Sequence, residues 1–516
     1  MAEPDAQRTA PHSADAADYA SLCGEDQLIV LANRAPYTHH VNEQGGINVS
    51  RATSGVVAAV EPLVAGCRGV WIARGSGSAD RRVADDGNAV AVPHQDPKYR
   101  LRYVWLSEEE EQGYYYGFAN EGLWPLCHRA FVKPAFREAD FNTYWAVNAR
   151  FAETVADEAR NSTPVVFVQD YHFGLAPAMI RGALPDATIV AFWHIPWPDR
   201  HTFSVCPWAR QLLDGLLGSS IIGFQKPSDR TNFLECVDQH PEFAVDRLAM
   251  TISAEGREIS LRVYPASIEW RDGTIEAPPF DECRVSVCER LVLDPTKLRL
   301  AVGVDRLDYT KGIAEKFLAV EQLLERYPEQ KGRFVLVQIA EPSRTKLRAY
   351  GDVRASVRST AQRINGRFGN ADYCPIILLE AHWTADDVAR LMRAADLCIV
   401  SSLHEGMNLV SKEFVRSRDD ERGVLLLSMF AGASRELDMA VPVNPHDPHG
   451  LADALALALA MPAQEQRIRM RCLRKAVAQA DAHRWAARII ADATGAPSPQ
   501  TMMPLRTAYS TTSAVL

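Results

Sequence analysis

Residues 298–312 read LRLAVGVDRLDYTKG, an apolar run that is followed at once by charged residues and a glycine. An apolar run without alternation is typical of a strand covered on both faces, as the strands of parallel sheets are. The next segment, residues 313–326, carries apolar residues at helical spacing. This stretch therefore predicts a buried strand, a short turn and a helix, with Arg306 and Lys311 at the carboxyl end of the strand.

The same alternation of apolar strands and amphipathic helices continues in both directions. The other predicted strands are 27–32, 165–168, 188–193, 221–224, 334–339, 376–379, 397–400 and 423–427, and the other predicted helices include 345–367 and 385–394. Such alternation is the pattern of an α/β fold with doubly wound sheets, which bind ligands at the carboxyl ends of their strands. We predict two Rossmann-like domains that face a central cleft.

The alternation weakens over about residues 275–297, which contain Pro278, Pro279 and Pro295, so we place the domain boundary there. The predicted division is a flexible segment 1–26, an N-terminal domain 27–280, a C-terminal domain 297–480, a helix 481–496 that packs back on the N-terminal domain, and a disordered tail 497–516. We expect both ends of the chain to be flexible because they lack the periodicity of a helix or a strand.

The composition excludes several classes of protein. Of the 516 residues, 47% are hydrophobic and 23% are charged, as in ordinary soluble globular domains. The net charge is −9, and an acidic protein repels the phosphates of nucleic acids and of anionic membranes. No apolar run approaches the roughly 18 residues of a membrane span, and residues 1–25 lack the apolar core of a signal peptide. We expect a cytoplasmic protein with no nucleic-acid or membrane partner.

The ten cysteines are scattered, and they do not form two pairs at the spacing of zinc ligands. We expect them to be reduced, structural thiols, because disulfides are rare in cytoplasmic proteins. The motifs of P-loop nucleotide hydrolases, of serine hydrolases and of zinc proteases are absent from the sequence. We therefore predict no metal site.

Two cations and a helix start form the first candidate site. Arg306 and Lys311 leave the end of a predicted strand, and Gly312 precedes the next helix. Helix N-termini attract anions through their free amides and dipole, and basic side chains add to that attraction. A diphosphate suits such a site. The competing interpretation is that both cations form surface salt bridges to Asp305 and Asp308.

Residues 405–413 (EGMNLVSKE) form the second candidate site, again after a predicted strand. Glu405 and Glu413 are about two helical turns apart, so both can face one ligand, and a carboxylate is well suited to hold vicinal hydroxyls. Free backbone amides are expected where this helix begins, at Asn408, Leu409 and Val410. The alternative is that Glu405 is only an acid near a helix N-terminus.

Weaker candidates lie at the ends of other predicted strands. Arg34 follows the first strand, and a glycine-bearing segment follows at Gly55. Asp170 and His194 can hydrogen-bond sugar hydroxyls, and the aromatic residues around Tyr115 and Trp124 can line a sugar site. Taken one at a time, an exposed arginine and aromatic core packing are the commoner explanations.

Taken in chain order, these motifs resemble those of the trehalose-6-phosphate synthase family, retaining glucosyltransferases with the GT-B fold. The motifs that carry the resemblance are NR (33–34), WP (124–125), DYH (170–172), HIPWP (194–198), RLDYTKG (306–312) and GMNLVSKE (406–413). The likeness extends from about Gln27 to Ile490. It implies transfer of glucose from UDP-glucose to glucose 6-phosphate with retention, which gives trehalose 6-phosphate and UDP.

The resemblance also implies roles for single residues. The C-terminal domain would bind the nucleotide sugar: Arg306 and Lys311 the diphosphate, Glu413 the ribose, Glu405 and the amides of Asn408, Leu409 and Val410 the glucose, with Gly55 in a loop over the nucleotide. The N-terminal domain would bind the acceptor through Arg34, Tyr115, Trp124 and Asp170, together with Arg344, and His194 and Asp170 would lie against the reacting sugars. The family resemblance implies no metal or other cofactor. Relatives in this family often form homo-oligomers.

Three residues depart from the family pattern. Glu405 stands where the family usually has Asp, Gln169 where many relatives have His, and Ser54 where a second glycine is common. Several alternatives stay open: another phosphorylated acceptor such as glycerol 3-phosphate or a cyclitol phosphate, or a non-catalytic relative that senses sugar phosphates. The donor base also stays open between UDP, GDP and ADP, and we expect it near Trp383 and Val388.

Overall fold

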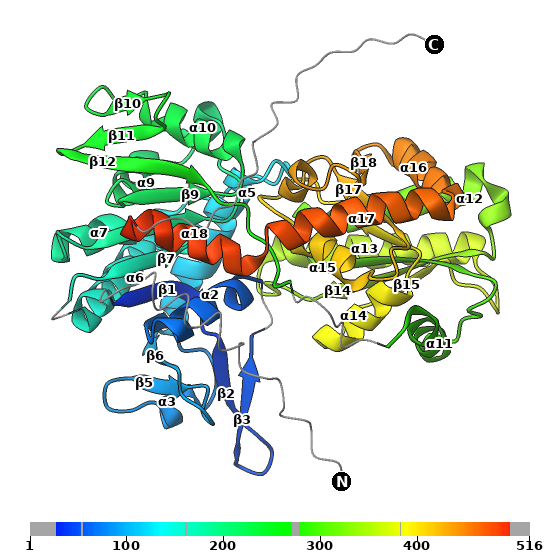
Figure 1. The fold of residues 1–516 in the computed structure, drawn as a ribbon, viewed down its shortest axis with the longest axis horizontal. Coiled ribbons are helices and arrows are strands. Elements are labelled where there is room, and N and C mark those ends of the chain that lie inside the picture. The colour runs from blue at the N-terminus through cyan, green and yellow to red at the C-terminus, as the bar shows by residue number, and fades with distance from the viewer. Residues whose placement is uncertain (1–26, 53–54, 160–161, 271–277, 382, 496–516) are drawn as a thin grey trace.

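The computed structural model describes residues 27–52, 55–159, 162–270, 278–381 and 383–495. The predictions for 1–26 and 497–516 lie outside the described residues. The described chain forms two α/β parts that lie side by side, each built around its own sheet (Figure 1).

The N-terminal sheet has the strand order β10-β11-β12-β9-β8-β7-β1-β4-β6-β5. Its strands are β1 (Leu28–Arg34), β4 (Val70–Arg74), β5 (Ala89–Val92), β6 (Tyr99–Val104), β7 (Val165–Gln169), β8 (Thr188–Trp193), β9 (Ile221–Phe224), β10 (Ala244–Asp246), β11 (Thr251–Ala254) and β12 (Arg257–Val263). Neighbours from β12 across to β6 are parallel, and β5, β10 and β11 are antiparallel. The helices of this part are α2 (Gly55–Gly66), α3 (Asp80–Val83), α4 (Glu108–Glu111), a π-helix (Gln112–Leu123), α5 (Trp124–Cys127), α6 (Glu138–Glu158), α7 (Ala176–Ala183), α8 (Arg200–Phe203), α9 (Ala209–Leu216) and α10 (Pro227–Val237).

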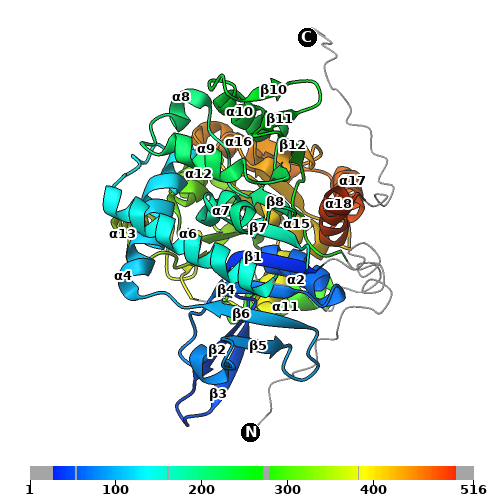
Figure 2. The ribbon, with the colours of Figure 1, turned by 90° about the vertical axis from the view of Figure 1, so that its left-hand side faces the viewer.

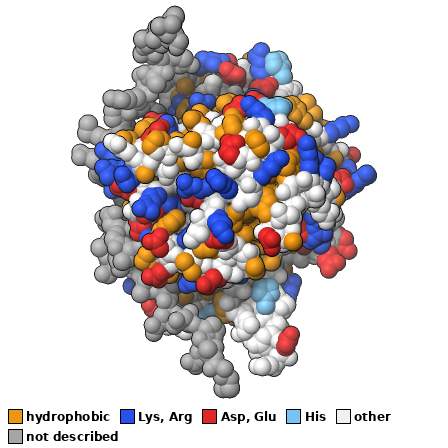
Figure 3. Space-filling model, turned by 90° about the vertical axis from the view of Figure 1, so that its right-hand side faces the viewer, with side chains coloured by type: hydrophobic (Ala, Val, Ile, Leu, Met, Phe, Trp, Pro, Cys, Tyr) orange, Lys and Arg blue, Asp and Glu red, His pale blue; other side chains and the backbone are white. Residues whose placement is uncertain are grey.

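The C-terminal sheet is parallel throughout, with the order β15-β14-β13-β16-β17-β18. Its strands are β13 (Arg299–Arg306), β14 (Phe334–Glu341), β15 (Ile376–Leu379), β16 (Leu397–Val400), β17 (Val424–Ser428) and β18 (Val441–Val443). Its helices are α11 (Phe280–Arg290), α12 (Ile313–Arg326), α13 (Arg348–Phe368), α14 (Ala385–Ala394), α15 (Leu409–Ser417), α16 (Pro448–Ala460) and α17 (Ala463–Gln479). Figure 3 shows the outer face of this part, where positive and negative side chains are interspersed.

Strand β1 shows why its apolar run does not alternate. Ile29 and Leu31 belong to the core on one face of the sheet, and Leu28 and Val30 belong to the core on the other face. Because both faces are covered by helices, every position from Leu28 to Ala32 is buried and apolar. Strand β13 is built in the same way. The predicted α/β class with two doubly wound sheets is therefore confirmed.

The last described helix, α18 (Ala482–Thr494), lies on the N-terminal part, although α17 just before it lies on the C-terminal part (Figure 1). Its Trp485 is in the N-terminal core, and the indole N–H donates to the carbonyl oxygen of Tyr264 at 3.0 Å. The hydroxyl of Tyr264 in turn donates to Asp492 at 2.6 Å. The chain thus crosses between the two parts a second time at about residue 480.

Strands β2 (Tyr37–Val41) and β3 (Ile47–Arg51) form an antiparallel ribbon that projects from the N-terminal part (Figures 1 and 2). The sequence analysis predicts no strand in this region. The ribbon is held at its base by His39, which is fully buried and bonds to Asp80 at 2.9 Å. A polar residue in the buried position hides the apolar alternation that would identify such a strand.

The structure also bears on membrane-spanning helices and on the state of the cysteines. In the described ranges, no helix is long and apolar enough to cross a membrane. Cys67 is disulfide-bonded, so the expectation that all cysteines are reduced is wrong for this residue. The eight other described cysteines are free thiols.

Candidate functional site

The carboxyl ends of the strands of the two sheets meet at one place. Arg34 ends β1, Asp170 follows β7 and His194 follows β8, while Arg306 ends β13. The two parts are in close contact here. A side chain on Gly406 would come within 2.1 Å of the carbonyl oxygen of His194, so only glycine fits. The site is therefore shared by both parts.

Arg306 carries a positive charge that no acidic side chain neutralises among the described residues. Its two candidate partners are engaged elsewhere: Asp305 bonds to Lys316 at 2.9 Å, and Asp308 bonds to Arg344 at 3.2 Å. The guanidinium of Arg306 lies 5.9 Å from the centre of the Trp124 ring. The surface salt bridges considered for Arg306 are thus not formed, and the cation is available to an anionic ligand.

Lys311, in contrast, pairs with Glu405 at 2.6 Å. Both side chains are only 12% exposed. The carboxylate of Glu405 also accepts hydrogen bonds from the hydroxyl of Ser402 and from the side-chain amide of Asn408, the latter at 3.2 Å. The sequence placed Lys311 and Glu405 in separate motifs, and the structure joins them into one ion pair that orients both side chains.

Helix α15 begins directly after Asn408, whose side-chain oxygen accepts from the amide of Ser411 at 2.8 Å. The first two helical amides, those of Leu409 and Val410, have no partner within an α-helix by geometry. Glu413 follows one turn later, and burial raises the pKa of its carboxyl group. The helix start and Glu413 therefore offer donors and a carboxylate at the same edge of the sheet.

Aromatic rings and arginines also gather near Arg306, around Tyr115 and Trp124. Tyr115 stacks on His172 with ring centres 5.6 Å apart and planes 8° apart. Burial by itself raises the pKa of Tyr115, but Arg344 and Arg34, which bond to its hydroxyl, outweigh burial and lower the pKa to about 8. The guanidinium of Arg344 lies 4.0 Å from the centre of the Trp124 ring. Two cations therefore converge on one phenol.

Asp170 lies between these groups and His194. Its backbone has φ = +70°, which is unfavourable for a residue with a side chain and is found mainly where function requires it. Its carboxylate accepts from the backbone amide of His194 at 3.0 Å. Burial raises the pKa of Asp170 to about 7, although the backbone amides that bond to it act in the opposite direction.

Sequence reasoning missed Lys226, which belongs to the site. Lys226 donates to the carbonyl oxygen of Glu405 at 3.1 Å and so links the two parts. It follows β9, so its place at the carboxyl end of a predicted strand was the signal that could have found it. Gly55 is the first residue of α2. Residues 53–54 before it lie outside the described residues, so the role of this loop stays a prediction.

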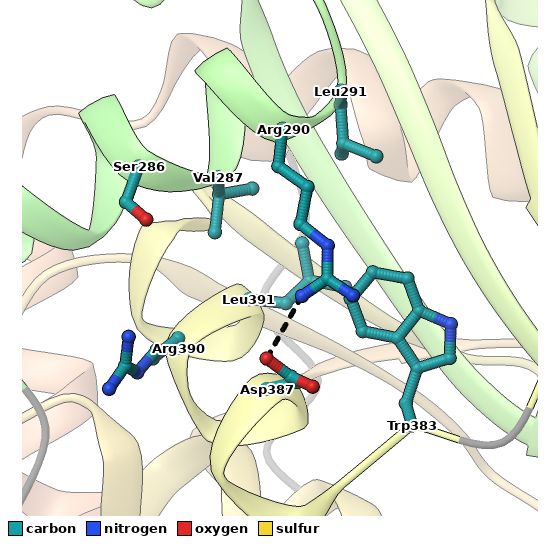
Figure 4. A pocket seen from close by; sticks show the side chains of 8 residues that line it. All are labelled: Ser286, Val287, Arg290, Leu291, Trp383, Asp387, Arg390 and Leu391. Atoms are coloured by element: carbon teal, nitrogen blue, oxygen red, sulfur yellow. Dashed lines mark hydrogen bonds and ion pairs between the residues drawn. The ribbon is translucent and has the colours of Figure 1, made fainter. Parts of the chain in front are cut away.

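A small cavity of about 70 Å³ lies between α11 and α14, beside Trp383 (Figure 4). Arg290 covers the Trp383 ring, with its guanidinium 4.1 Å from the ring centre, and bonds to Asp387 at 2.9 Å. One face of this ring is thus taken by a cation. The expectation that the donor base lies near Trp383 and Val388 stays a prediction.

The chain is similar to known proteins over most of its length. The model of glycosyltransferase family 20 matches residues 26–494. A trehalose-6-phosphate synthase of Mycobacterium avium is 37% identical over 472 residues, which are 90% of this chain and 94% of that protein. One of Mycolicibacterium vanbaalenii is 35% identical over 482 residues, 92% of this chain and 97% of that protein.

Solved structures are similar over the same span. An Escherichia coli protein bound with UDP-2-fluoro glucose has a TM-score of 0.78 and 28% identity, and the match covers 91% of this chain and 99% of that one. A UDP-forming α,α-trehalose-phosphate synthase of Burkholderia xenovorans, in complex with glucose 6-phosphate, has a TM-score of 0.77 and 31% identity, over 91% and 100% of the two chains. The fold is GT-B, as predicted, and the chain belongs to glycosyltransferase family 20.

Proposed function

We propose that this protein transfers glucose from UDP-glucose to glucose 6-phosphate with retention of configuration, which gives α,α-trehalose 6-phosphate and UDP. One observation carries the proposal. The place where the two parts meet holds several cations: Arg306 at the end of β13, which has no ion-pair partner among the described residues, and the pair Arg34 and Arg344 around Tyr115. One group suits the diphosphate of the donor, and the other suits the phosphate of the acceptor. The relatives reported above are named as trehalose-6-phosphate synthases, and they match nearly the whole chain.

The chemistry follows from where charge develops. When the bond between glucose and the diphosphate breaks, the departing UDP oxygen becomes negative. Arg306 lies where a free cation can stabilise that oxygen, and the first turn of α15 adds its dipole. Lys311 approaches the same charge when the diphosphate competes with Glu405 for its ammonium group. The resulting stabilisation exists mainly in the transition state, so it accelerates the reaction.

Retention requires that the acceptor hydroxyl attacks from the face that the diphosphate leaves. The bond between the anomeric carbon and the diphosphate oxygen breaks, and a bond from the same carbon to the acceptor oxygen forms. The departing phosphate oxygen takes the proton of the acceptor hydroxyl. We propose that Asp170, whose carboxylate accepts from the backbone amide of His194, orients the acceptor.

Glu405 has one methylene more than the aspartate usual at this position. We expect Glu405→Asp to leave turnover intact or to raise it, because the shorter acid withdraws from the donor sugar. The measurement is the initial rate of UDP release at saturating substrates. Glu465→Asp, a change to an exposed acid of α17 that bonds Arg469 at 2.9 Å, is the matched control. Complete loss of activity in Glu405→Asp would show that the pocket is built around the longer acid.

The test of the function itself is UDP release from UDP-glucose with and without glucose 6-phosphate, together with the mass of the product. Release that depends on the acceptor, with a disaccharide phosphate as product, supports the proposal. A product only with glycerol 3-phosphate or a cyclitol phosphate, or binding of UDP without turnover, would refute it.

We propose that the reaction needs no metal, because side-chain cations take the charge of the leaving group. Full activity in EDTA is therefore expected, and restoration by Mg²⁺ would contradict this.

We also propose that the protein works in the cytoplasm, where hexose phosphates and nucleotide sugars are made, and that it forms homo-oligomers. The β2–β3 ribbon supports self-association, because it exposes Val41, Ile47 and Val49 and β3 pairs with no strand other than β2 among the described residues. Sedimentation should show a species larger than one chain that Val49→Lys dissociates. A monomer at micromolar concentration would refute this part of the proposal.

A further inference from the structure

Both ring nitrogens of His194 are bonded to glutamine side chains. Nε2 of His194 lies 2.7 Å from the side-chain oxygen of Gln169, at the end of β7. Nδ1 lies 3.3 Å from the side-chain nitrogen of Gln225, just after β9. Glutamine does not titrate between pH 2 and 12, so neither partner can exchange a proton with the imidazole.

The bonds around Gln225 decide which nitrogen carries the proton. The side-chain oxygen of Gln225 accepts from the backbone amide of Ala266 at 2.8 Å, and this bond fixes the orientation of the amide group. The amide nitrogen of Gln225 therefore faces His194 and donates to Nδ1. An imidazole that accepts at Nδ1 carries its proton on Nε2, and this proton is donated to Gln169.

The same logic fixes Gln169. Its oxygen must face His194, because two amide donors would leave the imidazole without any proton. This orientation leaves the amide nitrogen of Gln169 buried and without a hydrogen-bond partner. An orphaned buried donor is costly, and proteins keep such a group mainly where function requires it. Packing alone therefore does not explain the arrangement.

The surroundings of the imidazole also favour its neutral form. The rings of Phe192 and Trp485 pack against it, and burial lowers the pKa of His194 to about 3. The titratable groups nearby are Asp170, which bonds to its backbone amide, and His172, whose pKa burial also lowers. A positive charge on the His194 imidazole would thus be buried between the apolar rings of Phe192 and Trp485, and no acidic side chain is bonded to either of its ring nitrogens.

We propose that Gln169 is a positioning residue for glucosyl transfer: together with Gln225 it holds His194 as a neutral imidazole with the proton on Nε2. The fixed ring sets the backbone of His194. That backbone orients Asp170 through its amide and meets Gly406 of the donor loop through its carbonyl oxygen. His194 then exchanges no proton during the reaction. The kinetic part of this inference rests on the proposed function, and the protonation state does not.

The first test is NMR of the full-length protein labelled with ¹⁵N-histidine, with the His194 signals assigned by their loss in His194→Asn. We expect a neutral imidazole protonated at Nε2 and unchanged from pH 5.5 to 8.5. In Gln169→Glu the carboxylate stabilises the imidazolium, so the same signal should titrate within this window. A wild-type His194 that titrates near pH 6.5, or that carries its proton on Nδ1, would overturn the proposal.

The second test is kinetic. Gln169→Leu keeps the bulk but removes the acceptor, so we expect kcat to fall about tenfold, with both KM values changed less than twofold. Gln169→His, which can still accept at a ring nitrogen, should recover at least a third of kcat. Gln362→Leu, on the exposed side of α13, is the matched control. Full activity of Gln169→Leu would refute the positioning role. Wild-type protein without synthase activity would refute the proposed function, and the NMR result would still decide the protonation state.

Discussion

Arg306→Ala should lower kcat by about 10²–10³, because removing one preorganised group that stabilises transition-state charge has that cost. Arg306 is the cation at the end of β13 that has no ion-pair partner in the described part of the chain, so its charge is available to the leaving diphosphate. Affinity for UDP-glucose should change far less than kcat, since the charge develops fully only as the bond breaks. The measurement is steady-state UDP release with a separate titration of UDP binding.

The matched control for this variant lies at the other end of the same strand. Arg299→Ala removes an exposed arginine that pairs with Asp396 at 3.3 Å, and exposed pairs contribute about 0–1 kcal/mol to stability. Its activity should stay within twofold of the unmodified protein. Near-normal turnover in a folded Arg306→Ala protein would show that another group stabilises the leaving UDP.

Arg344→Ala should lower kcat/KM for glucose 6-phosphate by about 10²–10³, mainly through KM. Arg344 is buried against Trp124, and it shares the hydroxyl of Tyr115 with Arg34. Losing about two charge-assisted hydrogen bonds to the acceptor phosphate, each worth about 1.5–2 kcal/mol at the low end for such bonds, gives this range. Binding of UDP should be unchanged. An unaltered KM for glucose 6-phosphate would remove Arg344 from the acceptor site.

Arg344 also has a structural partner, and the experiment must separate the two roles. Arg344, Arg306 and Lys311 outweigh the effect of burial and lower the pKa of Asp308. Without Arg344 the buried carboxylate loses its 3.2 Å partner, and breaking a buried pair costs about 3–5 kcal/mol of stability. Adding Asp308→Asn removes the unpaired charge, so the double variant should regain melting temperature but not affinity for glucose 6-phosphate. Recovery of both would mean that Arg344 acts only through stability.

The strand ends show how much could be predicted without coordinates. In a doubly wound sheet the carboxyl ends of neighbouring strands lie at one edge. Arg34, Asp170 and His194 could therefore be grouped from the sequence, because each comes at the end of an apolar run. Arg306 ends a strand of the other sheet and joins them only where the two sheets meet. Trp124 and Tyr115 lie within helical segments, so the sequence marked them only as aromatics that can line a sugar site, and the resemblance assigned them to the acceptor.

The β2–β3 ribbon shows where pattern reasoning does not reach. Its buried position is held by His39 through Asp80, 41 residues away. The identity of a polar residue does not reveal whether it is buried and bonded or exposed.

Local periodicity and short contiguous motifs are enough to predict the α/β class, the positions of the strand ends and the family. Which charges pair, in contrast, depends on how the two sheets dock. Lys311 is bonded to Glu405, whereas Arg306 is left free, and Gln169 and Gln225 together fix one proton on His194. Charge pairing and protonation depend on distances of a few ångströms between distant segments, and these distances are set when the two sheets dock.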